Sequence, residues 1–136
     1  MEGSCGYIVR ITKNEVLNRI YGQRIHYIEL RRDWSKGSKL VFMKRTSHTD
    51  YSFIGLGIID ETFNADRLNY SEKLICIKNN CYKKIVFGQL VKFYPAVTVK
   101  DSLKDTWKSP ALLHGAKVTE SEILRIENLV TAFIVS

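Results

Sequence analysis

At 136 residues, with 45% hydrophobic and 26% charged side chains, the chain has the size and composition of one globular domain, 1–136, which excludes a disordered polypeptide. It has no apolar run of bilayer-spanning length and no basic start followed by an apolar region, so we expect a cytoplasmic protein without a membrane partner. The net charge of +7 either keeps a small protein soluble or marks a basic binding surface.

The first half of the chain has patterns typical of one helix among several strands. Thr12 and Glu15 have the spacing of a capping box, and Gly22 stands where a left-handed C-cap is expected. Alternating apolar residues and β-branched or aromatic side chains indicate the strands. In chain order we expect a strand at 6–11, a helix at 13–21, and strands at 25–32, 39–45 and 52–60.

Two glycines mark the fourth expected strand. Alternation puts Ile54, Leu56 and Ile58 on one face and Gly55 with Gly57 on the other. Paired glycines on one face indicate a bend, a bulge or the close approach of another backbone, and a ligand lying over them is the alternative.

The second half of the chain ends in a helical pattern. Pro95 implies an edge position or a bulge in its strand, and Thr119 with Glu122 repeats the capping-box spacing. In chain order we expect a helix at 71–79, strands at 83–87 and 90–100, and a helix at 117–136 whose apolar stripe is Ile123, Ile126, Leu129, Val130 and Phe133. A helix, a run of strands and a final helix predict an α+β fold with a curled, mostly antiparallel sheet.

Catalytic and metal-binding motifs are missing from the sequence. The histidines and cysteines are scattered and few: His26, His48, His114, Cys5, Cys76 and Cys81. No pair of them repeats at zinc-ligand spacing, so we expect no metal and no cofactor. The odd number of cysteines argues against a disulfide framework and favours reduced thiols. No nucleophile motif or phosphate-binding glycine loop occurs either.

Positive charge is concentrated in two segments. Residues 24–45 carry seven basic and two acidic side chains, and residues 78–108 carry the same numbers, whereas the rest of the chain has seven basic and ten acidic side chains. If the two segments lie together in space, they form a basic surface of the kind that binds nucleic acid.

The first basic segment contains the most informative side chains. Glu29 and Arg31 project from one face of the expected strand, where they either engage a polar ligand such as a base edge or form a structural ion pair. Trp34 follows in a turn, where its indole either stacks on a base or covers the core. The other candidate cations of this segment are Arg24, Arg32, Lys36 and Lys39.

The second basic segment interleaves cations with aromatic residues. Lys92 precedes Tyr94, and Trp107 lies between lysines further along. Single-stranded nucleic acid is bound by this combination, because cations contact phosphates while rings stack on bases.

A family resemblance rests on residues 22–60. The stretch from Gly22 to Arg31 with its Glu-x-Arg, the turn Lys36-Gly37 with the strand after it, and Ile54-Gly55 resemble the ASCH domains of the PUA-like superfamily, and in outline an uncharacterised archaeal family. The resemblance implies a pseudo-barrel with flanking helices and a cleft that binds RNA or a modified base. By this resemblance Glu29 and Arg31 would line the cleft, with Lys36 and Lys39 near its rim.

The leading hypothesis is therefore a module that binds RNA or a modified nucleotide in nucleic acid. One alternative is an enzyme that acts on a nucleoside or a small amide in the same cleft, with Glu29 as general base if burial raises its pKa. The other alternative is a protein-interaction subunit, which would have the basic segments on opposite faces and a large exposed apolar patch.

Overall fold

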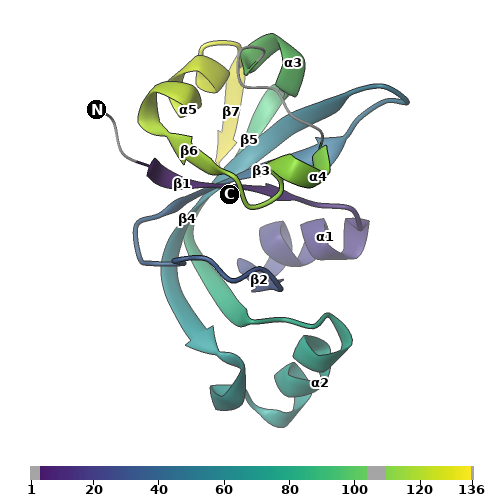
Figure 1. The fold of residues 1–136 in the computed structure, drawn as a ribbon, viewed down its shortest axis with the longest axis vertical. Coiled ribbons are helices and arrows are strands. Elements are labelled where there is room, and N and C mark those ends of the chain that lie inside the picture. The colour runs from purple at the N-terminus through teal and green to yellow at the C-terminus, as the bar shows by residue number, and fades with distance from the viewer. Residues whose placement is uncertain (1–3, 104–109, 136) are drawn as a thin grey trace.

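The computed structural model describes residues 4–103 and 110–135 (Figure 1). The strands are β1 (Ser4–Arg10), β2 (Ile25–Ile28), β3 (Lys39–Arg45), β4 (Tyr51–Asn64), β5 (Lys83–Thr98), β6 (Lys117–Thr119) and β7 (Ala132–Val135). The helices are α1 (Asn14–Gln23), η1 (Ala65–Arg67), α2 (Tyr70–Lys78), α3 (Val99–Ser102), α4 (Pro110–Leu113) and α5 (Glu120–Glu127).

The strands form one curled sheet in the order β2-β5-β4-β3-β1-β6, and β7 pairs with β5 beside this path. All pairings among the described strands are antiparallel except β1 with β3, which is parallel. Strand β4 pairs along one edge of β5. Strands β2 and β7 share the other edge of this long strand, where β2 pairs with residues 83–86 and β7 with residues 91–94. The expected α+β fold with a mostly antiparallel, curled sheet is confirmed.

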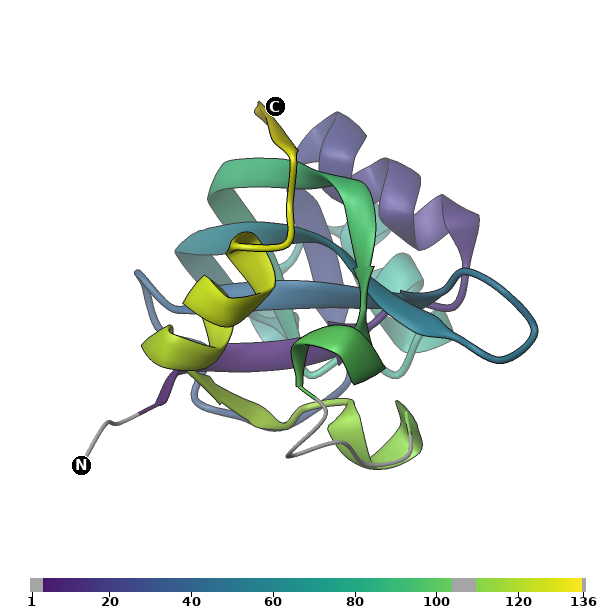
Figure 2. The same cartoon turned by 90° about the horizontal axis from the view of Figure 1, so that it is seen from above.

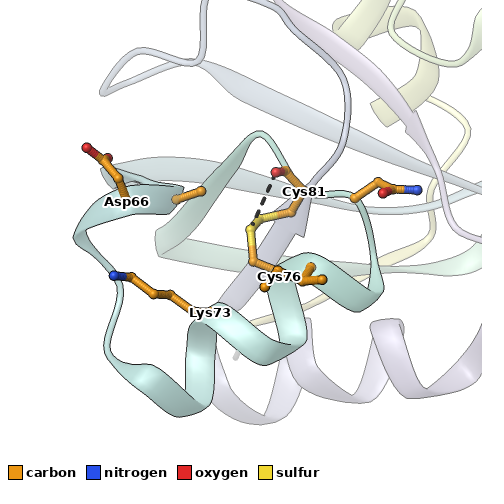
Figure 3. Close-up of a pocket in the computed structure, with 7 residues that line it drawn as sticks. Asp66, Lys73, Cys76 and Cys81 are labelled. Atoms are coloured by element: carbon orange, nitrogen blue, oxygen red, sulfur yellow. Dashed lines mark hydrogen bonds between the residues drawn. A yellow bond between two sulfur atoms is a disulfide. The ribbon is translucent and has the colours of Figure 1, made fainter.

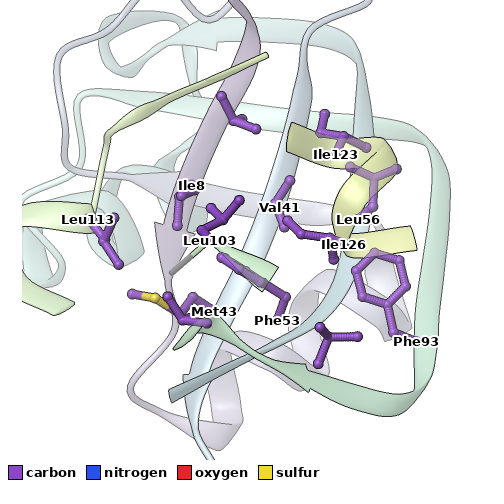
Figure 4. Close-up of a cluster of buried hydrophobic side chains, with 13 residues drawn as sticks. Ile8, Val41, Met43, Phe53, Leu56, Phe93, Leu103, Leu113, Ile123 and Ile126 are labelled. Carbon is purple, nitrogen blue, oxygen red and sulfur yellow. The ribbon is translucent and has the colours of Figure 1, made fainter. Parts of the chain in front are cut away.

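Both faces of the central strands are buried, each in its own apolar cluster. In β3, Val41 and Met43 face one side, and Leu40 and Phe42 face the other, as the period of two requires. Figure 4 shows the first cluster, where Ile8, Val41, Met43 and Phe53 of the sheet meet Ile123 and Ile126 of α5. The second cluster lies under α1 and includes Ile20 and Trp34. The first cluster continues with Leu56, Phe93, Val97, Val99, Leu103, Leu113 and Val118.

The prediction that glycine in β4 marks the close approach of another backbone is confirmed at Gly55. A Cβ atom at Gly55 would lie 2.4 Å from the carbonyl oxygen of Val91 and 2.1 Å from the hydroxyl oxygen of Tyr21, so only glycine allows this approach. The register of β4 with β5 shifts at this point, and the irregular stretch of β5 contains Pro95, as its bulge prediction requires. The predicted common face of Ile54 and Leu56 is wrong, because the bulge sends them to different clusters.

Both predicted caps of the first helix are wrong. The N-cap of α1 is Lys13, without a side-chain hydrogen bond, and the left-handed residue at its C-terminal end is Arg24, with φ of 64°. The capping box of Thr119 and Glu122 at α5 is confirmed. The physical difference is that Thr119 ends a paired strand and is held in position, whereas Thr12 lies in an exposed connection.

The predicted C-terminal helix is too long. Helix α5 ends at Glu127, and the chain then turns into β7, where the N–H of Thr131 donates to the carbonyl oxygen of Tyr94. Pairing with β5 overrides the helical spacing of Leu129 and Phe133, which are exposed instead of buried. The same override joins the two strands predicted at 83–87 and 90–100 into the single strand β5.

The expectation of reduced thiols is wrong for two of the three cysteines. The chain folds back after α2 through Asn80, which has φ of 52°, and the N–H of Cys81 donates to the carbonyl oxygen of Cys76. This turn brings the Cα atoms of Cys76 and Cys81 to 4.8 Å, and the two residues form a disulfide (Figure 3). Cys5 is free. A chain with three cysteines cannot join all of them in disulfides, but two that lie close in sequence can still form one.

Over residues 4–103 and 110–135, none of the helices is long and apolar enough to span a membrane.

Candidate functional site

A pocket of about 280 Å³ lies where the end of β1, the first turn of α1 and β2 meet the residues that follow α2 and α4. It is lined by Arg10, Ile11, Thr12, Lys13, Val16, His26, Tyr27, Glu29, Asn79 and His114. We call it the histidine pocket. Among the described residues that line it, Glu29 is the one carboxylate, beside two cations, Arg10 and Lys13, and two imidazoles, His26 and His114. A concave site in which titratable groups converge is the usual form of a ligand-binding site.

Glu29 and His114 form the most defined contact in the histidine pocket. Their Oε1 and Nε2 atoms are 2.6 Å apart. His114 Nδ1 accepts a hydrogen bond of 2.9 Å from the backbone N–H of Arg10, so the ring proton of a neutral His114 is on Nε2 and donates to Glu29. The turn that carries His114 is fixed by β1, because the N–H of Gly115 donates to the carbonyl oxygen of Ile8.

The contact with His114 decides the charge of Glu29. The hydrogen bond from His114 lowers the pKa of the Glu29 carboxyl and outweighs the opposing effect of burial. Glu29 is therefore an ionised hydrogen-bond acceptor at neutral pH. The condition that burial raises its pKa, on which its role as general base depends, is not met.

His26 is buried next to this pair, with 6% of its surface exposed, and its Nδ1 has no hydrogen-bond partner among the described residues. Burial lowers the pKa of His26 to about 4, so its imidazole is neutral at neutral pH. A buried nitrogen without a partner costs free energy unless something else bonds it. Nδ1 of His26 is thus a buried polar atom whose desolvation no hydrogen bond among the described residues offsets.

Tyr27, which lines the pocket, also joins β2 to α2 through a polar contact. Tyr27 donates from its hydroxyl to Glu72 Oε2 at 2.9 Å, and Lys84 forms an ion pair with the same oxygen at 2.5 Å. The hydrogen bond from Lys84 lowers the pKa of Glu72, and burial raises the pKa of Tyr27 to about 12. These contacts fix α2 against the β2–β5 pair.

The two basic segments meet beside the histidine pocket. Because β2 pairs with the first residues of β5, Tyr82 lies next to the chain that leaves β2, and its N–H donates to the carbonyl oxygen of Ile28. The guanidinium carbon of Arg31 lies 4.9 Å from the centroid of the Tyr82 ring, and the ammonium nitrogen of Lys83 lies 5.6 Å from it. One cation comes from each basic segment, and we call Arg31, Tyr82 and Lys83 the cationic platform.

Of the predicted binding residues, Glu29, Arg31 and Arg32 lie at or beside the histidine pocket. Arg32 donates from Nε to the carbonyl oxygen of Gly115, the residue after His114. Glu29 and Arg31 do not pair with each other, because His114 holds the first and Tyr82 the second.

Three predicted binding residues have structural roles. The Trp34 side chain is 2% exposed, and its indole donates to the carbonyl oxygen of Leu30 and packs edge-on against Tyr7. This ring therefore covers the core and does not stack on a base. Arg24 donates to the carbonyl oxygens of Phe87 and Gly88. Lys39 forms an ion pair with Glu120 at 2.9 Å, away from the pocket.

The remaining predicted residues lie elsewhere. Lys36 lines a different pocket and is 3.9 Å from Asp60. Lys92 lies over the ring of Tyr21, and the exposed Tyr94 pairs with β7. Trp107 lies outside the described residues.

Sequence reasoning missed Arg10, Lys13, His26 and His114 as site residues. Arg10 and Lys13 lie outside the two segments in which the sequence concentrates positive charge. His114 meets Glu29 across 85 positions and Arg10 across 104, and no local spacing signals such a contact. No group of three or more possible metal ligands occurs among residues 4–103 and 110–135.

The buried His26 predicts a loss of stability in mild acid. Its folded pKa of about 4 lies below the ordinary 6.5, so between these two values the unfolded chain binds a proton that the folded chain does not. The stabilisation is complete above pH 6.5 and is lost as the pH falls towards 4, by about 3 kcal/mol. Urea unfolding at several pH values measures this loss. His26→Gln should flatten the curve in this window, and equal curves for both proteins would contradict the assignment.

The fold of this chain is similar to that of the ASCH protein from Zymomonas mobilis. That crystal structure superposes with a TM-score of 0.56 at 8% sequence identity, covering 91% of this chain and 94% of the other. A point mutant of the same Zymomonas protein gives the same TM-score and identity and covers 97% of that chain. The likeness confirms the ASCH-like, PUA-like pseudo-barrel that the sequence resemblance implied.

No family model matches the sequence, and no curated protein matches it either.

Proposed function

We propose that the chain binds single-stranded RNA, with one nucleobase in the histidine pocket and the neighbouring phosphates on the cations around it. The observation that supports this most directly is the cationic platform, where Arg31 and Lys83 from the two basic segments share the ring of Tyr82. The ligand class follows by analogy from the ASCH-like fold.

The charge of this surface is available to a ligand. None of Lys13, Arg31 and Lys83 forms an ion pair with a carboxylate among the described residues. Their positive charges are therefore not neutralised internally, and phosphate oxygens are the natural partners of such cations. Lys13 lines the pocket itself, so a phosphate bound there would have a cation in addition to those of the cationic platform.

The histidine pocket suits a flat polar ring. Glu29 accepts a bond from His114 through Oε1, which leaves Oε2 for an amino group of a base. Arg10, Lys13 and Asn79 line the same pocket and add further polar groups. A base edge presents donors and acceptors side by side, and therefore matches these groups better than an apolar ligand.

Salt dependence tests the proposal. With Lys13, Arg31 and Lys83 on phosphates, raising the salt concentration fourfold should weaken binding about 20-fold, because each phosphate contact to a single strand contributes about 0.7 to the logarithmic slope. Fluorescence anisotropy with labelled oligoribonucleotides gives this slope. Absence of binding at low salt to any RNA or single-stranded DNA would refute the proposed function.

The contact between Glu29 and His114 favours a second candidate, an enzyme acting on a nucleoside. A carboxylate that an imidazole holds in place inside a pocket can orient a substrate group or a water molecule for proton transfer. The two candidates differ in one observable, which is turnover of modified nucleosides followed by chromatography. Turnover that Glu29→Gln abolishes would establish the second candidate, and binding without turnover would leave the first.

A further inference from the structure

The disulfide between Cys76 and Cys81 lines a second pocket, of about 520 Å³, to which Lys73 and Asn80 also contribute. We call it the disulfide pocket, and Figure 3 shows the bond between the two sulfur atoms there. Cys76 is buried, with 3% of its surface exposed, whereas Cys81 is half-buried. A small thiol can therefore reach the disulfide through the pocket, and Cys81 is the more accessible of the two cysteines.

The residues beside Cys81 belong to the surface that we propose for RNA. Asn79 lines the histidine pocket, and Tyr82 is the ring of the cationic platform. The backbone N–H of Tyr82 donates to the carbonyl oxygen of Ile28 in β2. The disulfide thus fixes a short segment that extends from the disulfide pocket to both parts of the proposed RNA site.

Helix α2 has a small apolar cluster of its own. Figures 1 and 2 show α2 at one end of the molecule, away from α5. The buried members of its cluster are Tyr27, Leu68 and Cys76, whereas each face of the central strands has a much larger cluster. Because Cys76 belongs to the small cluster, opening the disulfide acts on the attachment of α2 and leaves the two large clusters in place.

The turn after α2 also accommodates the reduced cysteines. Sγ of Cys76 lies 3.4 Å from the carbonyl oxygen of Cys81, which can accept a hydrogen bond from the thiol once the disulfide is open. The N–H of Cys81 donates to the carbonyl oxygen of Cys76 at 2.9 Å, and this bond does not require the disulfide. A disulfide that closes a short loop also stabilises a fold less than one that closes a long loop. Reduction is therefore expected to loosen the turn without unfolding the domain.

We propose that this disulfide is a redox switch, whose reduction by a small dithiol loosens residues 76–82 and weakens RNA binding. The effect on RNA rests on the proposed function, whereas the loosening does not.

The reaction is thiol–disulfide exchange. One thiolate of the dithiol attacks Sγ of Cys81, which forms a mixed disulfide and releases the sulfur of Cys76 to take up a proton. The second thiolate of the dithiol then attacks its own partner sulfur in the mixed disulfide and releases Cys81, which is protonated in turn. The protein disulfide gains two electrons and two protons, and the dithiol loses the same number and becomes a cyclic disulfide.

Hydrogen exchange without RNA tests the switch itself. The amides of Cys81 and Tyr82 should exchange about tenfold faster in dithiothreitol, because the segment opens more often. Their protection should return when the reductant is replaced by a small-molecule disulfide. The internal control is the amide of Thr131, which donates to the carbonyl oxygen of Tyr94 and should exchange equally in both states. Equal exchange of Cys81 and Tyr82 in the two states would overturn the proposal.

Fluorescence anisotropy with a labelled oligoribonucleotide tests the consequence. Reduction should raise the Kd about fivefold and reversibly, because a smaller fraction of the chain has the binding conformation. The double variant Cys76→Ser and Cys81→Ser should bind like the reduced protein with and without dithiothreitol. The matched control Cys5→Ser alters the free cysteine and should respond like the unchanged chain.

The two measurements separate the switch from the proposed function. An affinity that is equal in both redox states, or that dithiothreitol changes as much in the double variant, would overturn the switch. An oxidised protein that binds no RNA would refute the proposed function, and faster exchange on reduction would still support the switch.

Discussion

Exchanging Arg31 and Lys83 for glutamate is expected to weaken binding of single-stranded RNA about 100-fold at low salt. Each of these cations would contribute about 1.5 kcal/mol through a charge-assisted bond to phosphate, and the introduced carboxylates add repulsion. The double variant should also reduce the salt slope, because fewer counterions are released. Both effects are measured in one set of anisotropy titrations with the same oligoribonucleotide.

The matched control is the pair Lys36→Glu and Lys100→Glu. This pair changes the net charge by the same amount at side chains that are 79% and 71% exposed. Neither lysine lines the histidine pocket or stacks on Tyr82. We expect the control to lose much less affinity. Equal losses would mean that net charge alone drives binding, and a larger loss in the control would favour the rim that the sequence resemblance places at Lys36.

The fold was predictable from the sequence wherever local patterns and tertiary pairing agree. The capping box of Thr119 succeeds because β6 delivers this residue to the start of α5 in an extended conformation. The prediction for Gly55 succeeds because the backbone of β5 and the hydroxyl of Tyr21 occupy the space that a side chain would need. Where pairing opposes local spacing, as at Phe133, the sequence pattern indicates a helix and the sheet edge forms a strand instead.

The site was predictable only in part, since its polar contacts join distant segments. Glu29 and Arg31 were identified from their neighbours in sequence. Their partners His114 and Tyr82 come from other elements and give each residue a different role. The prediction for Trp34 as a base-stacking residue is wrong for a related reason. Its basic neighbours in sequence favour an exposed ring, whereas Tyr7 of β1 packs against the indole and buries it.

The core beneath α1 connects fold stability to the histidine pocket. Phe42 is completely buried, and its ring contacts those of Tyr21 and Phe87 edge-on, with centroids 6.1 and 5.6 Å away. Tyr21 belongs to α1, and its hydroxyl donates to the carbonyl oxygen of Val91, so Phe42 supports the contact that holds the helix on the sheet. The first turn of the same helix supplies Val16 to the wall of the pocket.

Phe42→Ala is therefore expected to lower the free energy of unfolding by about 3 to 5 kcal/mol, because it removes a buried ring from its contacts and leaves a cavity. Phe53→Ala is the matched control, since Phe53 is equally buried in the cluster on the other face of the sheet. Both variants should lose similar stability in urea unfolding. Under conditions where both stay folded, we expect only Phe42→Ala to weaken RNA binding further, because its cavity loosens α1. Equal affinities in the two variants would show that the pocket is held without the support of Phe42.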